Sequence, residues 1–418
     1  MLKRQLIDDL FSAEVQGSAS QLVTSSFHHF INDGYKWSLY PLLYLIADEF
    51  GLTYGATGAI NTAYNALLSA TSIPFGFLAE RIGELTALTL GTAVFCVGFA
   101  LLSLAWSYPV FLGKAFIAGA GSGAAHPIGS SYASGAAPEG RMGTFIGVFN
   151  FAGDVGKAVV PILAGILASF FGWRVALFTL GAVGVFVTLG LDRWARDDEA
   201  DGAVESDERI EGASDDPPVP EAEPADHQFC SPSSDWGVKS WLQFAALNAV
   251  GILDSLARAG VVVFASFVLQ DKGFSTSSIG GMLSLIAVGG SLGKLLCGPL
   301  GDIIGKRSGI IGTEVLTSAT MLLFIYGSGW WMFPVLVVMG FFLNGTSSIL
   351  YALVPHITTE SGRSRGFGMY YTTTLATHGL SPLIYGVIGD WVGLYPMYQI
   401  MAAALLLTVP VTLLLKTD

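Results

Sequence analysis

The chain has 418 residues, of which 52% are hydrophobic and only 12% are charged, and its formal net charge is −12 at pH 7. A soluble core cannot hold so large an apolar fraction, so the composition excludes an ordinary soluble domain. We expect an integral membrane protein.

Residues 1–20 precede the first long apolar segment. They include Lys3 and Arg4, but no continuous apolar core and no small-residue cleavage site, so we expect no removable signal peptide. Apolar residues recur here at helical spacing at Leu2, Leu6, Leu10 and Phe11. This spacing predicts a short N-terminal amphipathic helix on the inner membrane surface.

About twelve apolar segments are long enough to cross a hydrocarbon layer of ~30 Å. In chain order they are expected near 23–48, 55–80, 85–106, 109–134, 142–171, 173–193, 238–271, 276–303, 309–327, 331–359, 364–391 and 395–416. Backbone polar groups in lipid must be satisfied within each segment, and alternating ten-residue strands are absent from the sequence. We therefore expect helices rather than a β-barrel.

A short motif occurs twice in the chain. The sequence GFLAERIG at 76–83 returns as GPLGDIIG at 298–305, at a constant offset of 222 residues. Each copy follows the second span of its half, which places both copies on one membrane face. The predicted fold class is an all-α membrane protein with twelve transmembrane helices in two pseudo-symmetric six-helix bundles, at 21–195 and 236–418.

Residues 196–235 separate the two halves. They include fourteen acidic and two basic residues, which account for the whole net charge, and they include few large apolar residues. Such a segment buries too little surface to offset the entropy lost on ordering. We expect a disordered acidic cytoplasmic linker, and the alternative is a regulatory or partner-binding segment.

Basic residues in the short loops favour one membrane face. This face is expected to hold Arg81, Arg141, Arg193, Lys306, Arg307, Arg363 and Arg365. Only Arg174 and Lys272 fall in loops on the other face. Because basic residues remain on the cytoplasmic side, we expect both termini in the cytoplasm and the chain in the plasma (inner) membrane.

Motifs for enzymatic chemistry are absent from the sequence. There is no GxSxG elbow, no HExxH and no Walker lysine loop, so serine hydrolysis, zinc chemistry and ATP-driven pumping have no recognisable site. Cys96, Cys230 and Cys297 are isolated and lack metal-ligand spacing. We expect no enzyme activity, no metal and no cofactor. A non-transporting membrane receptor or scaffold is the alternative class, but it explains the duplication poorly.

Three predicted spans carry an acid with a base three or four residues later. These pairs are Asp33 with Lys36, Asp154 with Lys157, and Asp254 with Arg258. Each charge near the centre of a span costs roughly 2.5–3.5 kcal/mol, so several together predict a polar site between helices. Intrahelical ion pairs that fix helix rotation are the alternative interpretation.

A base beside a desolvated aspartate lowers the proton affinity of that carboxylate. A bound anion that competes for the base would release the aspartate to take a proton. We hypothesise proton coupling at Asp33, Asp154 and Asp254, and expect Lys36, Lys157 and Arg258 to hold negative charge on a small organic solute. The expected mechanism is proton-coupled alternating access around a site between the two bundles.

Further polar side chains in the predicted spans are candidates for solute binding. They are Tyr40, His126, Asn150, Tyr370, Thr374 and Thr377. The alternative for His126 is a packed hydrogen-bond donor, and hydroxyls can instead bond their own backbone. Lys294 and Glu314 are expected to pair with each other, and the alternative is that they line the solute pocket.

The segments GFLAERIG and GPLGDIIGKR resemble the loop motif that the major facilitator superfamily places between helices 2–3 and 8–9. FGWR at 171–174 is another common feature of that superfamily. The resemblance implies that charged residues of these two loops latch the cytoplasmic face closed. The implied gating residues are Glu80, Arg81, Asp302, Lys306 and Arg307.

Within the superfamily, segments 28–35, 119–156 and 366–393 are similar to the fosmidomycin-resistance group of efflux proteins. This resemblance implies export of a small, phosphonate-like or otherwise anionic compound in exchange for protons. Proton-coupled uptake of an organic anion by symport is the alternative. The expected partners are the solute, protons and the lipid bilayer, without nucleic acid, and we expect a monomer.

Overall fold

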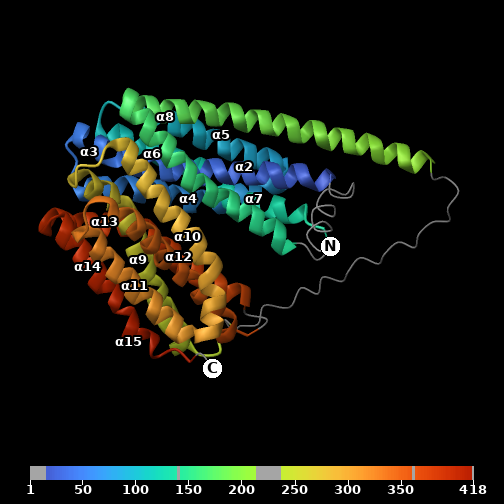
Figure 1. The fold of residues 1–418 in the computed structure, drawn as a ribbon. Helices are drawn as coiled ribbons and strands as arrows, with labels where there is room; N and C mark the ends of the chain where they lie inside the picture. The colour runs from blue at the N-terminus through green and yellow to red at the C-terminus, as the bar shows by residue number, and fades with distance from the viewer. Residues whose placement is uncertain (1–15, 139–141, 213–236, 360–362, 417–418) are drawn as a thin grey trace.

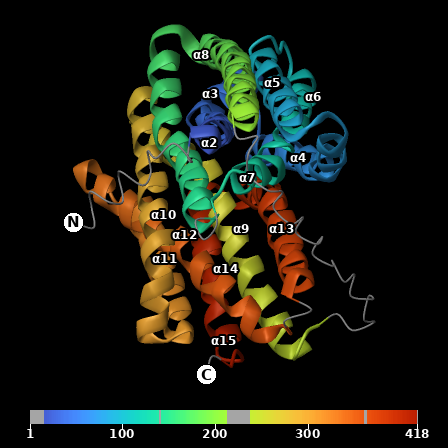
Figure 2. The ribbon, with the colours of Figure 1, turned by 90° about the vertical axis from the view of Figure 1, so that its right-hand side faces the viewer.

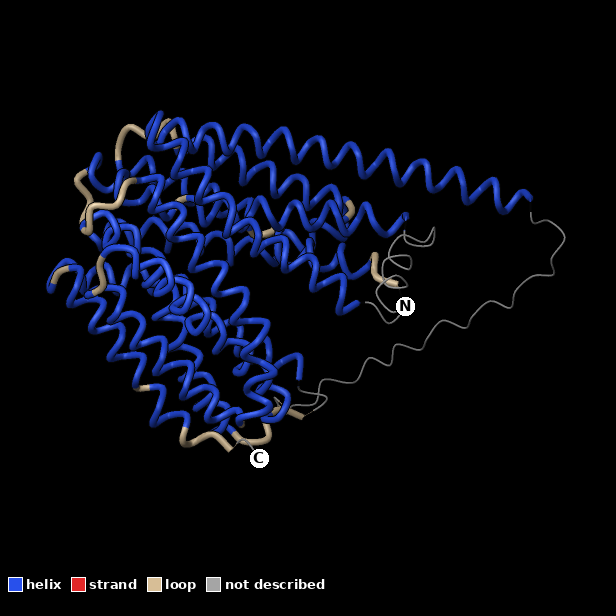
Figure 3. The backbone as a smooth tube through the Cα atoms, in the orientation of Figure 1, coloured by secondary structure: helices blue, strands red, loops and turns tan. Residues whose placement is uncertain are grey.

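The computed structural model describes residues 16–138, 142–212, 237–359 and 363–416. Almost all of these residues are helical, as Figures 1 and 3 show. Within these ranges, β-pairing is limited to one isolated bridge between Val238 and Thr358. The expected N-terminal amphipathic segment lies mostly outside the described residues, as does the second part of the expected acidic linker.

The N-terminal half contains the first six spans. Its helices are α2 (Gln16–Ser38), η2 (Tyr40–Leu42), α3 (Leu43–Phe50), α4 (Tyr54–Ile82), α5 (Glu84–Leu102), α6 (Tyr108–Ser122), α7 (Ala125–Gly135) and α8 (Met142–Gly212). The fourth span is divided between α6 and α7. Pro127 accounts for this break, since it lacks an N–H and its ring clashes with the carbonyl of Gly123, four residues earlier.

Helix α8 contains two of the expected spans. They are separated at Gly172, whose φ of 79° is a conformation that glycine adopts readily. The helix then continues to Gly212, so the expectation of disorder from residue 196 is wrong for 196–212. Arg196 donates a hydrogen bond back to Asp192 at 2.9 Å, and the Ala and Glu residues of the sequence that follows favour a helix.

The C-terminal half contains the other six spans. Its helices are α9 (Trp241–Asp271), α10 (Thr276–Ile304), α11 (Lys306–Tyr326), η3 (Gly329–Trp331), α12 (Met332–Ile357), α13 (Arg363–Val392), α14 (Leu394–Leu406) and α15 (Thr408–Thr412). Gly83 and Gly305, which end the two copies of the repeated motif, both have a positive φ and both separate consecutive helices.

Among the described residues, seven helical segments are long and apolar enough to cross a membrane by length and composition alone. The segment in α8 holds two crossings. Helices α2, α4 and α13 are long enough but more polar, and α6 with α7 completes the fourth crossing. The chain is an integral membrane protein of twelve helices in two six-helix bundles, so the predicted fold class is confirmed.

The two halves lie in contact at one end of the molecule and diverge toward the other (Figure 1). One hydrophobic core crosses both halves and includes Ile60 from α4 and Phe264 from α9. Two smaller cores each lie within a single half, one around Leu88 and the other around Leu350. We call the shared end, where Tyr54 meets Asp390, the closed end. The end that carries Gly83 and Gly305 is the open end.

Two helix crossings close the closed end, on opposite sides of the molecule (Figure 2). In the crossing of α4 with α13, a Cβ added at Gly58 would lie 2.0 Å from the carbonyl oxygen of Pro382. In the crossing of α8 with α10, a Cβ added at Gly280 would lie 2.3 Å from the carbonyl oxygen of Pro161. Glycine therefore permits backbone contact in both crossings.

A carboxylate from one half caps a helix of the other half at the closed end. Asp390 on α13 accepts hydrogen bonds from the backbone N–H of Tyr54 at 2.7 Å and of Gly55 at 3.1 Å. These groups belong to the first turn of α4, where backbone N–H groups have no partner within the helix. The negative charge also interacts favourably with the positive end of the helix dipole.

We expect Asp390→Asn to weaken closure of this end by about 1 kcal/mol, because the neutral amide loses the favourable interaction of the charge with the helix dipole. The reporter is Thr62→Cys on α4, since the Thr62 hydroxyl donates to the Gly379 carbonyl across the interface at 2.8 Å. When Asp390→Asn is added, a bulky thiol reagent should label this cysteine about fivefold faster than in the protein that carries Thr62→Cys alone. Asp48→Asn, which changes an exposed carboxylate on α3, is the control, and equal rates in the two variants would contradict the proposed cap.

Candidate functional site

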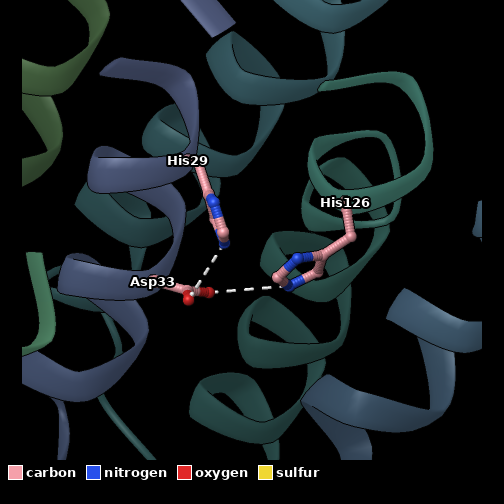
Figure 4. Close-up of side chains that lie close together, drawn as sticks. All are labelled: His29, Asp33 and His126. Atoms are coloured by element: carbon pink, nitrogen blue, oxygen red, sulfur yellow. Dashed lines mark ion pairs between the residues drawn. The ribbon is translucent and has the colours of Figure 1, made fainter. Parts of the chain in front are cut away.

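Asp33 on α2 holds a buried carboxylate that three basic side chains surround. One oxygen lies 2.7 Å from Lys157 Nζ and 3.2 Å from His29 Nε2, and the other lies 3.5 Å from His126 Nε2. Figure 4 shows the two imidazole rings directed at the carboxylate from α2 and α7. Asp33 is only 4% exposed, so these charges interact in a region of low dielectric constant.

Close packing of α2 against the first part of α8 brings these groups together. A Cβ added at Gly156 would lie 2.4 Å from the carbonyl oxygen of Phe30, and one at Gly153 would lie 2.7 Å from the His29 ring. Glycine at both positions therefore lets the helices approach. As a result, Lys157, one position after Gly156, reaches Asp33.

Asp154 joins the two halves of the molecule. Its carboxylate lies 3.0 Å from Lys157 Nζ on the same helix and 3.0 Å from Lys294 Nζ on α10 of the other half. The Lys294 side chain is 40% exposed. We call His29, Asp33, His126, Asp154, Lys157 and Lys294 the central charged cluster. It contains an ion pair that directly links the two bundles.

Lys36 has a different partner from the one expected. Its ammonium donates to Asn65 Oδ1 at 2.9 Å and lies 5.4 Å from the ring centre of Tyr64, and it forms no ion pair with Asp33. Asn65 contacts Asn61, whose amide donates to the Tyr40 hydroxyl at 3.1 Å. The expected Asp33–Lys36 pair is therefore wrong, because Asp33 pairs with Lys157 of α8. Lys36 and Tyr40 belong to one polar network beside the cluster.

The C-terminal half has its own buried charges on α9 and α11. Arg258 donates to Asp254, as the spacing of four residues predicted. Glu314 on α11 is 1% exposed, and neither of its carboxyl oxygens has a hydrogen-bond partner among the described residues. The expected pairing of Lys294 with Glu314 is wrong. Helix α10 packs against α8, where Asp154 is within reach of Lys294.

The polar residues expected along α13 use their hydroxyls mainly within their own helix. Thr374 and Thr377 each donate to the backbone carbonyl four residues earlier, at 2.9 and 2.7 Å. Tyr370 is buried, whereas Asn150 on α8 is exposed. These geometries match the backbone-bonded alternative for the two threonines. A solute-binding role for the four residues stays a prediction.

The five expected gating residues lie at the open end. Lys306 Nζ contacts His356 Nε2 at 2.7 Å, and Arg307 donates to the backbone carbonyl of Leu415. Glu80, Arg81 and Asp302 are exposed. In the part of the chain that the structure describes, no ion pair joins the loop at 80–84 to the loop at 302–307. This separation fits the divergence of the two halves at this end.

Helical spacing places His29, Asp33, Lys36 and Tyr40 on one stripe, but neither the His29–Asp33 contact nor the Lys294–Asp154 contact was predicted. His29 stands four residues before Asp33, which is the spacing of neighbours on a helix surface. Lys294 lies inside an apolar span, where a lone charge requires a partner. Only the fold shows that the partner of Lys294 is Asp154, because the two residues are 140 positions apart.

Twelve membrane crossings in two bundles, with acids and bases from both bundles meeting between them, define a class of protein. Such an arrangement is that of a secondary transporter, in which the bundles move around a site at their interface. A family model described as Major Facilitator Superfamily matches residues 26–246 and 247–418. The chain belongs to the major facilitator superfamily, as the motif resemblance indicated, and it is a transporter of small organic solutes rather than an enzyme.

Individual relatives share only a low sequence identity with the chain. The chain is 25% identical to the fosmidomycin resistance protein of Escherichia coli, over 90% of this chain and 88% of that protein. It is 23% identical to the "Probable sulfoacetate transporter SauU" of Cupriavidus necator, over 87% of this chain and 85% of that protein. A bacterial homologue of the human lysosomal transporter Spinster, solved inward-facing and unoccupied, has the same fold, with a TM-score of 0.71, 16% identity and 95% coverage of both chains.

Proposed function

We propose that the protein carries a small organic anion together with a proton, by alternating access. The observation that supports this most directly is the shared carboxylate of Asp154, which lies 3.0 Å from both Lys157 and Lys294. Two ammonium groups at one interface provide a binding site for a carboxylate, sulfonate or phosphonate group. The similarity to a protein named for sulfoacetate supports the same class of solute.

The shared bases set the sign of coupling between anion and proton. An anion that binds Lys157 draws this base away from Asp33 or Asp154, and a desolvated carboxylate without its base binds a proton more readily. By reciprocity, a proton on the carboxylate frees the lysine to bind the anion. Binding of one therefore favours binding of the other, which is the condition for symport. An inward proton gradient would then drive uptake.

Efflux by antiport is the second candidate function. The similarity to a fosmidomycin resistance protein over most of both chains favours it. Antiport requires that proton and anion exclude each other from the site. Symport and antiport therefore predict opposite effects of anion binding on proton binding, and this difference can be measured.

We assign roles to the remaining site residues on this basis. Lys36 and Arg258 add positive charge near the anion, and Asp254 is a third proton carrier that is paired with Arg258. The side chains that would contact the rest of the solute are Tyr40, His126, Asn150, Tyr370, Thr374 and Thr377. The residues that would close the open end in the alternate state are Glu80, Arg81, Asp302, Lys306 and Arg307.

We place the open end in the cytoplasm, with both termini, because the repeated motifs and most loop arginines and lysines lie there. The proposed bundles are 21–195 and 236–418, joined by an acidic linker at 196–235, and the proposed unit is a monomer in the plasma (inner) membrane. Since the halves are separate at this end, the described conformation corresponds to an inward-facing state.

Purified protein in liposomes tests the proposal. Sulfoacetate and fosmidomycin are the test anions, and choline and glycerol are the cationic and neutral controls. Symport predicts that an acidic exterior drives anion accumulation, whichever way the protein is inserted. Accumulation driven by an acidic interior would favour antiport, and no response to either gradient with either anion would contradict the proposal.

We expect Asp154→Asn to reduce pH-driven anion transport by about 30-fold, because loss of one partner of a partly buried charge pair falls at the lower end of the range of about 2–5 kcal/mol for buried pairs. The amide keeps the shape of the carboxylate but cannot carry a proton between the lysines. Lys294→Gln should reduce transport similarly, since it removes the cross-bundle base. Initial uptake rates at matched membrane insertion provide the measurement. Unchanged coupling in Asp154→Asn would remove this residue from the mechanism.

A further inference from the structure

Three side chains of the central charged cluster are metal-ligand types that face one another. They are His29, Asp33 and His126, and their ligand atoms all lie within 4.8 Å of one another. The two imidazole nitrogens lie 3.2 and 3.5 Å from the Asp33 oxygens. Two ligands on a tetrahedral zinc ion, each about 2.0–2.1 Å from the metal, stand roughly 3.3 Å apart. The two histidines approach different oxygens of Asp33, so the remaining separations among the three ligands, which reach up to 4.8 Å, must shorten when an ion binds.

The His29 ring is held in the orientation that a metal ligand requires. Its Nδ1 lies 2.9 Å from the carbonyl oxygen of Phe149, so Nδ1 carries the hydrogen and donates it. The ring stacks on Phe149 with 4.2 Å between centroids and rests on the backbone at Gly153. In the neutral ring the lone pair is therefore on Nε2, which faces an Asp33 oxygen at 3.2 Å. A backbone carbonyl on the other nitrogen is the usual outer partner of a ligating histidine.

Access to these three ligands comes from the side of His126. Its side chain is 51% exposed, whereas those of His29 and Asp33 are 5% and 6% exposed. His126 is the second residue of α7, just after the break between α6 and α7. Three protein ligands with one accessible side leave a fourth position free for water or for an anionic group of the solute.

Lys157 is the competitor for such an ion. Its ammonium lies 2.7 Å from Asp33 and would repel a divalent cation at the same carboxylate. It also lies 3.0 Å from Asp154, so it can leave Asp33 and keep an acidic partner. Metal binding therefore requires a shift of Lys157 toward Asp154, and it becomes easier when this charge is absent.

We propose that His29, Asp33 and His126 form a binding site for a divalent transition-metal ion of the zinc class, which competes with Lys157 for Asp33. Two imidazoles and one carboxylate favour zinc, cobalt or nickel over magnesium or calcium, which prefer oxygen ligands. The proposed transport function is not needed for this inference, because metal binding is measured directly.

The test uses the full chain in detergent without a polyhistidine tag, and calorimetric titration with Zn²⁺. We expect one Zn²⁺ per chain and no comparable heat with Mg²⁺. Co²⁺ should show the intense visible absorption of a four-coordinate site. His126→Ala is the main variant because this exposed side chain can be removed without opening the core, and it should weaken Zn²⁺ binding by at least about 100-fold.

Two further variants distinguish Zn²⁺ binding at this site from Zn²⁺ binding elsewhere on the protein. Lys157→Met should tighten Zn²⁺ binding by about tenfold or more, since the competing charge is removed. His356→Ala is the matched control, because this histidine contacts Lys306 at the open end, and it should bind as the parent does. The proposal is overturned if the parent does not bind Zn²⁺, if His126→Ala binds it as well as the parent, or if Lys157→Met weakens binding.

Discussion

Asp33→Asn is expected to abolish proton-driven anion transport, with a fall of about 100-fold or more in the initial rate. The carboxylate contacts Lys157, His29 and His126, and the amide removes its charge without changing its shape. Loss of one partner from such a buried set corresponds to about 2–5 kcal/mol, and about 2.8 kcal/mol equals a factor of 100. Uptake into proteoliposomes under an imposed pH gradient measures the effect.

The control for this variant is Asp48→Asn on α3. Its carboxylate is exposed and lies outside the central charged cluster, so the same chemical change should leave transport near the parent rate. Size-exclusion profiles of both variants verify that the folded protein is recovered. If Asp33→Asn keeps the pH dependence of the parent, Asp33 is not a proton carrier.

Gly58→Ala is expected to prevent closure of the closed end. The added Cβ would lie 2.0 Å from the Pro382 carbonyl oxygen and 2.4 Å from its carbon, and backbone cannot move aside as a flexible side chain can. Overpacking of this kind costs about 1–3 kcal/mol, which shifts an open-to-closed equilibrium by roughly 5- to 150-fold. We expect loss of transport and fast labelling of the Thr62→Cys reporter.

Gly113→Ala on α6 provides the control for Gly58→Ala. A Cβ at Gly113 meets no atom within 4 Å, so this substitution should preserve both transport and slow labelling of the reporter. The comparison removes any general effect of alanine in a membrane-spanning helix. Equal labelling and transport in the two variants would show that the α4–α13 crossing does not close the path.

Local patterns in the sequence predicted the features that depend on neighbouring residues. Apolar length identified the spans, and spacing along one helix identified the Asp154–Lys157 and Asp254–Arg258 pairs. The same reasoning failed for Asp33, because the nearest base in space is Lys157 of another helix rather than Lys36. Helix periodicity shows which residues share a face, but not what that face meets.

Contacts between the two halves could not be predicted from the sequence for the same reason. Lys294 and Asp154 meet only because α10 crosses α8, and the glycines that permit this crossing were not distinguishable from the many other glycines of the chain. Glu314 lacks a hydrogen-bond partner among the described residues for a similar reason, since its expected partner Lys294 is held across the interface. The acidic composition of 196–212 predicts disorder, whereas the structure continues α8 through this segment to Gly212.

The central claim is that an organic anion and the aspartates of the central charged cluster compete for the same lysines. Proton exchange on anion binding tests it most directly, with purified protein in weakly buffered detergent solution, a pH indicator dye and saturating sulfoacetate or fosmidomycin. We expect net proton uptake by the parent when the anion binds, and reduced uptake in Asp33→Asn and Asp154→Asn. Proton release on binding, or binding without any change in pH, would contradict it.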